Sequence, residues 1–181
     1  MKINAPFYCG VGSRDTPPEV LEQMTAIAII LEAQGYILRS GHADGADLAF
    51  ELGSNGHNQI WLPWKGFNYE SPLSQSLPRT GHYAIQANWQ ADQIAAAFHP
   101  AWNKCSEGAK KLHTRNVYQV LGPGLGKVQI ETVSKFIVCW TSDGKASGGT
   151  GQAIRIAEGT GIPVFNLFNA DAMDQLEAFF A

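Results

Sequence analysis

Three glycine-rich segments carry the residues whose types and spacing could do chemistry in this sequence. Each follows a short apolar run and mixes glycine with polar or charged side chains: residues 10–14, 40–47 and 141–151. Glycine lets the backbone N–H groups of a turn approach a ligand closely, and such turns bind phosphate groups. Because the carboxyl ends of parallel strands meet at one edge of a sheet, we expect the three segments to form one ligand site.

The third segment has the clearest anion-binding pattern. Residues 147–150 are Ser, Gly, Gly and Thr, and the helix predicted over 149–158 opens without an acidic residue. An uncovered helix N-terminus carries partial positive charge, so we expect a phosphate group to bind there. Arg14 has a planar guanidinium that matches an oxyanion, and a surface salt bridge to Asp15 is its alternative role.

Four polar residues next to predicted helices are further candidates. Asp44 and Asp47 stand at the start of a helix, where they can cap its free N–H groups. In contact with a ligand, the same carboxylates would accept hydrogen bonds from ribose hydroxyl groups. Arg115 and Asn116 lie where a polar helical stretch becomes apolar, a position that can point into a cleft.

The cysteines and histidines show no pattern of a metal site or a disulfide framework. The three cysteines are an odd number without C-x-x-C spacing, and the five histidines contain no H-x-x-x-H pair. We therefore predict no metal and no cofactor, and any metal site would have to be assembled by the fold. The chain begins without a signal-peptide pattern and has no long apolar window, so we expect a cytoplasmic protein without membrane contact.

Composition limits the kind of partner. The 181 residues include 13 Lys and Arg against 16 Asp and Glu, for a formal net charge of −3. This balance argues against a general binder of the phosphate backbone, which usually needs a basic face. The most basic stretch, residues 104–116, is a solvated helix face by default and a single-stranded DNA surface as the alternative.

The elements that must position these segments follow from hydrophobic periodicity. Strands alternate with helices, which predicts a Rossmann-like, doubly wound α/β fold with a mainly parallel five-stranded sheet and helices on both faces. A capping box at Thr16-Pro17-Pro18-Glu19 should open the first helix, and Gly35 should end it. The predicted strands lie at residues 7–12, 36–40, 59–62, 136–140 and 162–167. Further helices are expected at residues 47–52, 84–98, 105–121 and 171–180, besides the one at 149–158.

One domain over residues 1–181 is expected, with an aromatic-rich insertion at about 63–103. Residues 63–82 show neither a helical nor a strand period. Trp64, Phe67 and Tyr69 in this segment can form a lid or a stacking wall for a base, and a partner-contact surface is an equal alternative.

Several motifs in sequence order resemble the DprA/Smf family of DNA-processing proteins. Residues 12–14 resemble its G-S-R motif, and residues 40–47 resemble S-G-G-A-x-G-I-D, with His42 and Ala46 as departures. Residues 114–121 resemble its R-N-R-I-I-A helix, and residues 147–149 followed by 162–165 fit its last helix–strand step. The wider SLOG superfamily joins these proteins to the LONELY GUY (LOG) phosphoribohydrolases and related nucleotide sensors.

The resemblance implies a nucleotide or single-stranded DNA site at the carboxyl edge of the sheet. Carried over by position, its lining would be Gly12, Ser13, Arg14, Gly41, Gly45, Asp47, Arg115, Asn116, Gly148, Gly149 and Thr150. The strand-end segments add Asp44, Asp143 and Ser147 to these ligand-binding candidates.

The hydrolases of this superfamily carry a P-G-G-x-G-T-x-x-E motif whose Glu helps to cleave the N-glycosidic bond. Here Gln152 stands at the Thr and Arg155 at the Glu, which removes the stabiliser of an oxocarbenium-like centre. An enzyme would need another carboxylate, with Asp47, Asp44 and Asp143 as candidates, and Asp47 with Arg115 as the candidate catalytic pair.

Three functions therefore remain open. The leading hypothesis is a binding protein, expected as a homo-oligomer, for a nucleotide or a nucleotide-derived small molecule. The alternatives are an enzyme acting at a nucleotide N-glycosidic bond and a DprA-like protein that binds single-stranded DNA. The sequence leaves open whether the protein is an enzyme at all.

Overall fold

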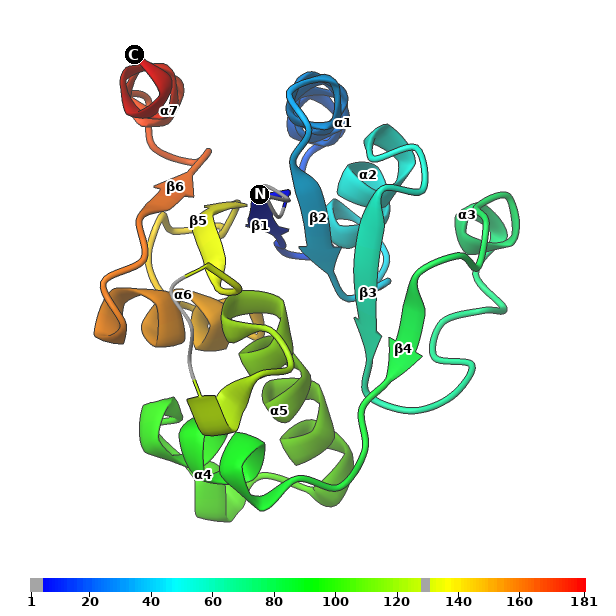
Figure 1. The fold of residues 1–181 in the computed structure, drawn as a ribbon, viewed down its shortest axis with the longest axis vertical. Helices are drawn as coiled ribbons and strands as arrows, with labels where there is room; N and C mark the ends of the chain where they lie inside the picture. The colour runs from blue at the N-terminus through cyan, green and yellow to red at the C-terminus, as the bar shows by residue number, and fades with distance from the viewer. Residues whose placement is uncertain (1–4, 128–130) are drawn as a thin grey trace.

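The computed structural model describes residues 5–127 and 131–181, which form a six-stranded sheet in the order β4-β3-β2-β1-β5-β6 (Figure 1). Every neighbouring pair of strands is parallel. The predicted parallel α/β fold is thus confirmed, with six strands in place of five. The strands are β1 (Phe7–Gly10), β2 (Ile37–Ser40), β3 (Asn58–Leu62), β4 (His82–Ala84), β5 (Ser134–Cys139) and β6 (Val164–Asn166).

The additional strand, β4, lies in the segment expected to be irregular. It has three residues, none of them buried, and pairs along β3 from Ile60 to Leu62 at the edge of the sheet. Three residues are too few for a period of two to be recognised, and an edge strand has no core-facing apolar pattern to reveal it. A one-turn helix, α3 (Pro72–Gln75), precedes it in the same segment.

Two layers of helices cover the sheet (Figure 1). One face carries α1, α2 and α7, and the other carries α4, α5 and α6. Along β5, Phe136 and Val138 pack toward the first layer, whereas Ile137 and Cys139 pack toward the second. This alternation is the period of two of a strand that is buried on both faces. The longer helices are α1 (Pro18–Ala33), α2 (Ala46–Gly53), α4 (Trp89–Phe98), α5 (Glu107–Leu121), α6 (Thr150–Gly159) and α7 (Ala172–Phe180), with short 3-10 turns η1 (Trp102–Lys104) and η2 (Leu125–Lys127).

The strand order reverses between β1 and β5. From β1 the chain builds the sheet outward to β4, then returns through α4 and α5 to place β5 on the other side of β1. Gly10 of β1 pairs with Val138 of β5, so the carboxyl ends of these strands lie side by side. In such sheets the two loops that leave a reversal point enclose a crevice, which is the usual ligand position.

The first helix begins where expected, but for a different reason. Pro17 occupies the N-cap position without a side-chain hydrogen bond to the helix, so the capping-box prediction is wrong. Thr16 instead donates its hydroxyl hydrogen bond to the carbonyl oxygen of Ser13, 2.7 Å away, and thereby folds the loop after β1. Gly35 ends the helix in the left-handed region, at φ 84°.

No helix within residues 5–127 and 131–181 combines the length and apolar character needed to cross a bilayer. The cysteines of the chain, Cys9, Cys105 and Cys139, are all free thiols.

Candidate functional site

A cavity of about 650 Å³ opens at the carboxyl ends of β1 and β5, against α5. It is lined by most of the residues singled out in the sequence: Gly12, Ser13, Arg14, Asp47, Arg115, Asn116, Asp143, Ser147, Gly148, Gly149 and Thr150. Two of the three glycine-rich segments therefore meet at one place, and the third contributes Ala43 and Asp47 to it.

Three candidates, Gly41, Asp44 and Gly45, lie outside the cavity lining. The carbonyl oxygen of Gly41 accepts a hydrogen bond from Arg115. Gly45 is in the left-handed region at φ 80°, and a Cβ there would lie 2.7 Å from the carbonyl oxygen of Ser13. Gly41 and Gly45 therefore allow close packing beneath the site rather than contact within it.

Asp44 is bound by the insertion. It precedes α2, whose N-cap is Gly45, and its Oδ1 accepts hydrogen bonds from Ser71 Oγ at 2.6 Å and Asn68 Nδ2 at 3.0 Å. These bonds, that from Ser71 first, lower the pKa of Asp44. The expected capping role of Asp44 is thus not seen, because its carboxylate faces residues 68–71.

One wall of the cavity is a turn with free N–H groups. The backbone N–H groups of Gly148, Gly149 and Thr150 donate to no acceptor within the described part of the chain. They sit at the N-terminus of α6, which has no acidic residue in its first turn and no side-chain cap. Free N–H groups at a positive helix end form a site for an anion.

Two neighbours hold this turn in shape. Asp143 Oδ1 accepts hydrogen bonds from Ser147 Oγ at 2.7 Å and from the Lys145 N–H at 3.0 Å, and these bonds lower the pKa of Asp143. On the other side, Asn116 donates from Nδ2 to the carbonyl oxygen of Gly149, 3.2 Å away. The turn is thereby fixed against α5. The Asp143 carboxylate is used for hydrogen bonds within the turn.

Arg14 is an exposed cation on the rim of the cavity. Its side chain makes no hydrogen bond or ion pair with residues 5–127 or 131–181, and the alternative salt bridge to Asp15 is not formed. Ser13 Oγ accepts a hydrogen bond from the Asp15 N–H instead. The guanidinium of Arg14 is therefore available to an anion at the cavity.

The floor of the cavity holds an incompletely paired charge pair. Arg115 Nη1 lies 3.8 Å from Asp47 Oδ2, and both side chains are buried. Arg115 Nε is also buried and finds no hydrogen-bond partner among the described residues. Burial raises the pKa of Asp47 to about 6 against the opposing effect of Arg115, and burial lowers the pKa of Arg115. Buried charges that lack partners are costly, which favours a polar ligand over this floor.

Gln119 is a lining residue that the sequence analysis did not select. Its side chain is fully buried, and neither Nε2 nor Oε1 has a hydrogen-bond partner in the described residues. It lies one helical turn after Arg115 and so shares that residue's face of α5. This spacing from Arg115 is the sequence signal that could have identified it.

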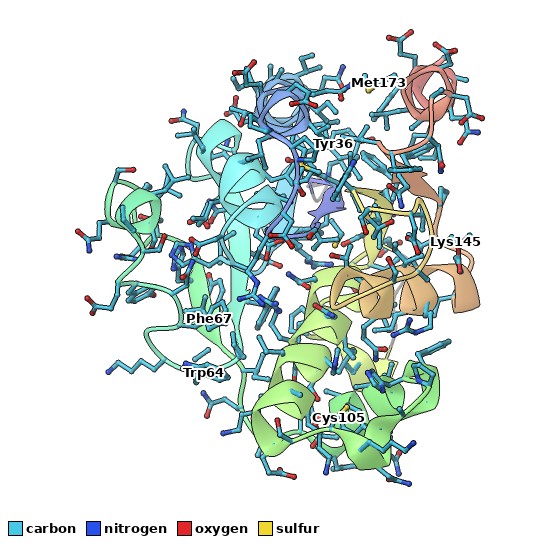
Figure 2. The ribbon with its side chains drawn as sticks, turned by 180° about the vertical axis from the view of Figure 1, so that it is seen from behind. Tyr36, Trp64, Phe67, Cys105, Lys145 and Met173 are labelled. Atoms are coloured by element: carbon cyan, nitrogen blue, oxygen red, sulfur yellow. The ribbon has the colours of Figure 1, made fainter. Side chains whose placement is uncertain are left out.

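Of the three insertion aromatics, Phe67 lines the cavity. The Arg115 guanidinium carbon lies 5.7 Å from the centre of its ring, and Trp64 packs edge-on against it at 5.3 Å. Figure 2 shows Trp64 and Phe67 together on the loop after β3, on the side that faces α5. Tyr69 lies elsewhere, with its hydroxyl 3.1 Å from His82 Nδ1.

A buried polar network attaches the insertion to α2. Glu51 contacts His42 Nδ1 at 2.6 Å and His82 Nε2 at 2.8 Å, and His42 Nε2 lies 2.6 Å from Ser74 Oγ. His42 adopts a left-handed φ of 62° in this position. Burial raises the pKa of Glu51, but the hydrogen bonds from His42 and His82 outweigh it and lower the pKa. His42, which stands where the S-G-G-A pattern has a glycine, therefore anchors residues 63–82.

The residues at the hydrolase motif have structural roles. Arg155 donates to the carbonyl oxygens of Phe98 and Ala146, at 2.8 and 3.0 Å, and to Gln152 Oε1 at 3.1 Å. Gln152 in turn donates to the carbonyl oxygen of Ala95. Neither side chain lines the cavity, so this motif position supplies no catalytic carboxylate.

Comparison with known proteins gives a match to a solved structure. No family model matches the sequence, and no curated protein matches it. The fold is similar to a solved structure of DNA processing protein A from Helicobacter pylori, described for its single-stranded DNA binding mode, with a TM-score of 0.61. The similarity covers 96% of this chain and 72% of that one.

The chain has a DprA-like fold. The two sequences are 17% identical, so the comparison establishes the architecture and leaves the function to the site. Membership of the wider SLOG superfamily and the expected homo-oligomer stay predictions. Within the DprA-like fold, the cavity lies at the point where the strand order reverses.

Proposed function

We propose that the protein binds single-stranded DNA and holds one nucleotide of the strand in the cavity beside α5. The observation that carries this proposal is the arrangement of unpaired groups around one cavity. Three free N–H groups and Arg14 lie on its wall and rim, while Arg115 Nε and the side-chain amide of Gln119 lie on its floor without hydrogen-bond partners among the described residues. The proposal is supported by the DprA-like fold, whose solved representative is described as binding single-stranded DNA.

The phosphate would lie against residues 148–150 and Arg14. Free backbone N–H groups and a guanidinium are the donors that recognise phosphate oxygens, and a helix N-terminus adds a favourable field. A single charge-assisted contact of this kind is worth about 1.5–3 kcal/mol.

The sugar and base would lie toward the floor. The amide of Gln119 offers one donor and one acceptor, the combination that pairs with a base edge, and the ring of Phe67 offers a stacking face. Asp47 would accept a hydrogen bond from a ribose hydroxyl group only if the ligand were a free ribonucleotide, because deoxyribose within a DNA strand has no free hydroxyl group. A base in this position would satisfy polar atoms that otherwise stay unpaired in a buried place.

The site favours a single strand over a duplex. A cavity of about 650 Å³ accepts an unstacked nucleotide, and the overall charge of −3 supplies no general basic face. On α5, Lys110 is already paired with Glu107 at 3.0 Å, which reduces the alternative DNA surface of residues 104–116. A free nucleotide, the leading hypothesis from the sequence, would use the same contacts.

The test is fluorescence anisotropy with a labelled oligothymidylate, with mononucleotides as competitors. Arg14→Ala and Gly149→Asp should each weaken binding by about tenfold or more, since 1.4 kcal/mol corresponds to tenfold. Gly149→Asn is the matched control: nothing lies within 4 Å of a Cβ at this glycine, and the variant adds no charge. Unchanged oligonucleotide affinity in both Arg14→Ala and Gly149→Asp would disprove the site.

Competition separates the two ligands. If mononucleotides displace the oligonucleotide only at much higher concentration, DNA is the ligand; if they bind more tightly than it does, the free nucleotide is. The salt dependence of binding distinguishes the cavity from the basic stretch at residues 104–116. Each phosphate contact with a single strand contributes about −0.7 to the slope of log affinity against log salt concentration. One or two contacts predict a shallow slope. A steep slope that is lost on removing Lys104 and Lys111 would place the DNA on residues 104–116 instead of in the cavity.

A second function, cleavage of a nucleotide N-glycosidic bond, is favoured by one observation. Asp47 lies at the cavity with its pKa raised to about 6, a value suited to a general acid near neutral pH. Release of free base from a nucleotide, measured by chromatography and lost in Asp47→Asn, would support an enzyme. Absence of any product with the common nucleotides would exclude it.

A further inference from the structure

We propose that His99, Cys105 and His113 form a binding site for a divalent transition metal, with Zn²⁺ as the best match. His99 follows the last residue of α4, Cys105 follows η1, and His113 lies on α5. One ligand atom from each of the three side chains lies within 4.8 Å of the other two. This proposal does not rest on the proposed DNA binding.

The geometry is close to that of a loaded site. Cys105 Sγ lies 3.8 Å from both ring nitrogens of His99, and the rings of His99 and His113 have their centres 4.3 Å apart. A tetrahedral zinc ion with Zn–S of about 2.3 Å and Zn–N of about 2.1 Å places its ligand atoms about 3.4–3.6 Å apart. To seat an ion, the donor atoms, which now lie within 4.8 Å of one another, would have to move closer together to this separation.

The ligand atoms are not committed elsewhere. His113 Nδ1 is buried without a hydrogen-bond partner in the described residues. Apart from its contacts with His99, Cys105 Sγ makes a weak 3.6 Å contact with the Ala101 carbonyl oxygen. The Ala101 N–H donates to His99 Nδ1 at 3.1 Å. Binding through His99 Nε2 would put the ring proton on Nδ1, and this one hydrogen bond would have to break because both groups would then be donors.

The donor set selects the class of metal. One thiolate and two imidazoles suit zinc and its neighbours in the transition series, whereas magnesium and calcium prefer oxygen ligands. Arg155 adds a positive charge near both histidines, which a thiolate at Cys105 would offset. Three protein ligands leave a fourth position for water, and His113 also lines the cavity.

The second histidine cluster has no ligand atoms free to bind a metal. In His42, Glu51 and His82 the carboxylate and the ring nitrogens already bind one another and Ser74, so a metal would have to displace several buried hydrogen bonds. A metal bound by His99, Cys105 and His113 would instead link the end of α4 to α5, the helix that forms the floor of the cavity. Figure 2 shows Cys105 in this region, beside the lower turns of α5.

The test is titration of chelator-treated protein with Co²⁺, a spectroscopic substitute for zinc. We expect one ion per chain with a thiolate-to-metal charge-transfer band, displacement by Zn²⁺, and an increase in Tm on adding Zn²⁺. Cys105→Ser and His113→Asn should lose the band and the increase in Tm, with the Tm of the metal-free protein close to that of the wild type.

Matched controls keep the test specific. His57→Asn removes a histidine that is 64% exposed, and Cys139→Ala removes a thiol buried in the sheet; both should keep the band. A wild-type protein without the band, or a band that persists in Cys105→Ser, would overturn the proposal. So would cobalt binding that is lost in His82→Asn and kept in His113→Asn.

Discussion

Arg115 donates a hydrogen bond from Nη1 to the carbonyl oxygen of Gly41, a residue 74 positions earlier in the chain. The bond joins the middle of α5 to the carboxyl end of β2 and holds the guanidinium beside Asp47. A Cβ at position 41 would overlap Arg115 Nη1 and would lie 2.6 Å from Gln119 Nε2. The floor of the cavity therefore requires glycine at position 41.

Gly41→Ala should destabilise the protein and distort this floor. Overpacking of a filled interior costs about 1–3 kcal/mol, and the displaced Arg115 and Gln119 should also weaken oligonucleotide binding. Urea unfolding and anisotropy measure the two effects. Gly108→Ala, in α5 and with open space around its Cβ, is the control and should be neutral or stabilising by up to about 1 kcal/mol. Wild-type behaviour of Gly41→Ala would contradict the assigned packing.

Gln119→Leu should raise stability while lowering affinity. The change removes two buried polar atoms without hydrogen bonds, which cost about 1–3 kcal/mol, but it also removes the proposed contacts with the base. Gln152→Leu is the comparison, because both amide atoms of Gln152 are hydrogen-bonded and their loss should destabilise. A Gln119→Leu protein that binds oligonucleotide as well as the wild type would remove Gln119 from the site.

Asp47 should make stability fall as pH rises from about 4 to 6. Its pKa is raised from 3.8 to about 6 in the folded protein, so the folded state binds the proton more tightly than the unfolded state. The stabilisation is complete below pH 4 and is lost as pH rises through 6, an effect of about 3 kcal/mol. The charged and titratable groups acting on Asp47 are Arg115, Glu51, His42 and Cys9.

The measurement for Asp47 is urea unfolding of the wild type and Asp47→Asn in parallel between pH 4 and 7. Asparagine does not titrate, so the variant should gain stability relative to the wild type as pH rises. Parallel measurement cancels the groups that titrate identically in both proteins. A difference that stays constant with pH would show that the buried carboxyl keeps its ordinary pKa.

His42→Ala should release the insertion. The variant leaves the buried Glu51 with one partner fewer, and breaking a buried pair costs about 3–5 kcal/mol. Backbone amides in residues 63–82 should exchange hydrogen faster than in the wild type, while those of β1 and β5 keep their relative order of protection. His57→Ala is the control, since its ion pair with Glu32 is largely exposed. Equal protection of the insertion in both variants would contradict the anchoring role.

Local patterns were sufficient to predict much of the architecture. The alternation of apolar runs with helical periods predicted the parallel sheet, and Gly35 ended α1 as expected, since these features depend on neighbours a few residues away. The same holds for the unprotected start of α6, because helix polarity and the absence of an acidic residue are visible in the sequence. The strand β4 was missed because its position depends on pairing with β3 and not on its own pattern.

The tertiary structure decided how the candidates are used. Asp44 and Asp47 are three residues apart and equivalent as a local pattern, but Asp44 faces Ser71 and Asn68 while Asp47 faces Arg115. The convergence of Gln119 on the cavity and of His99, Cys105 and His113 on one point likewise depends on how helices pack. Sequence spacing determines which residues share a strand or a helix face. Packing between distant segments determines which side chains meet, and that requires the whole fold.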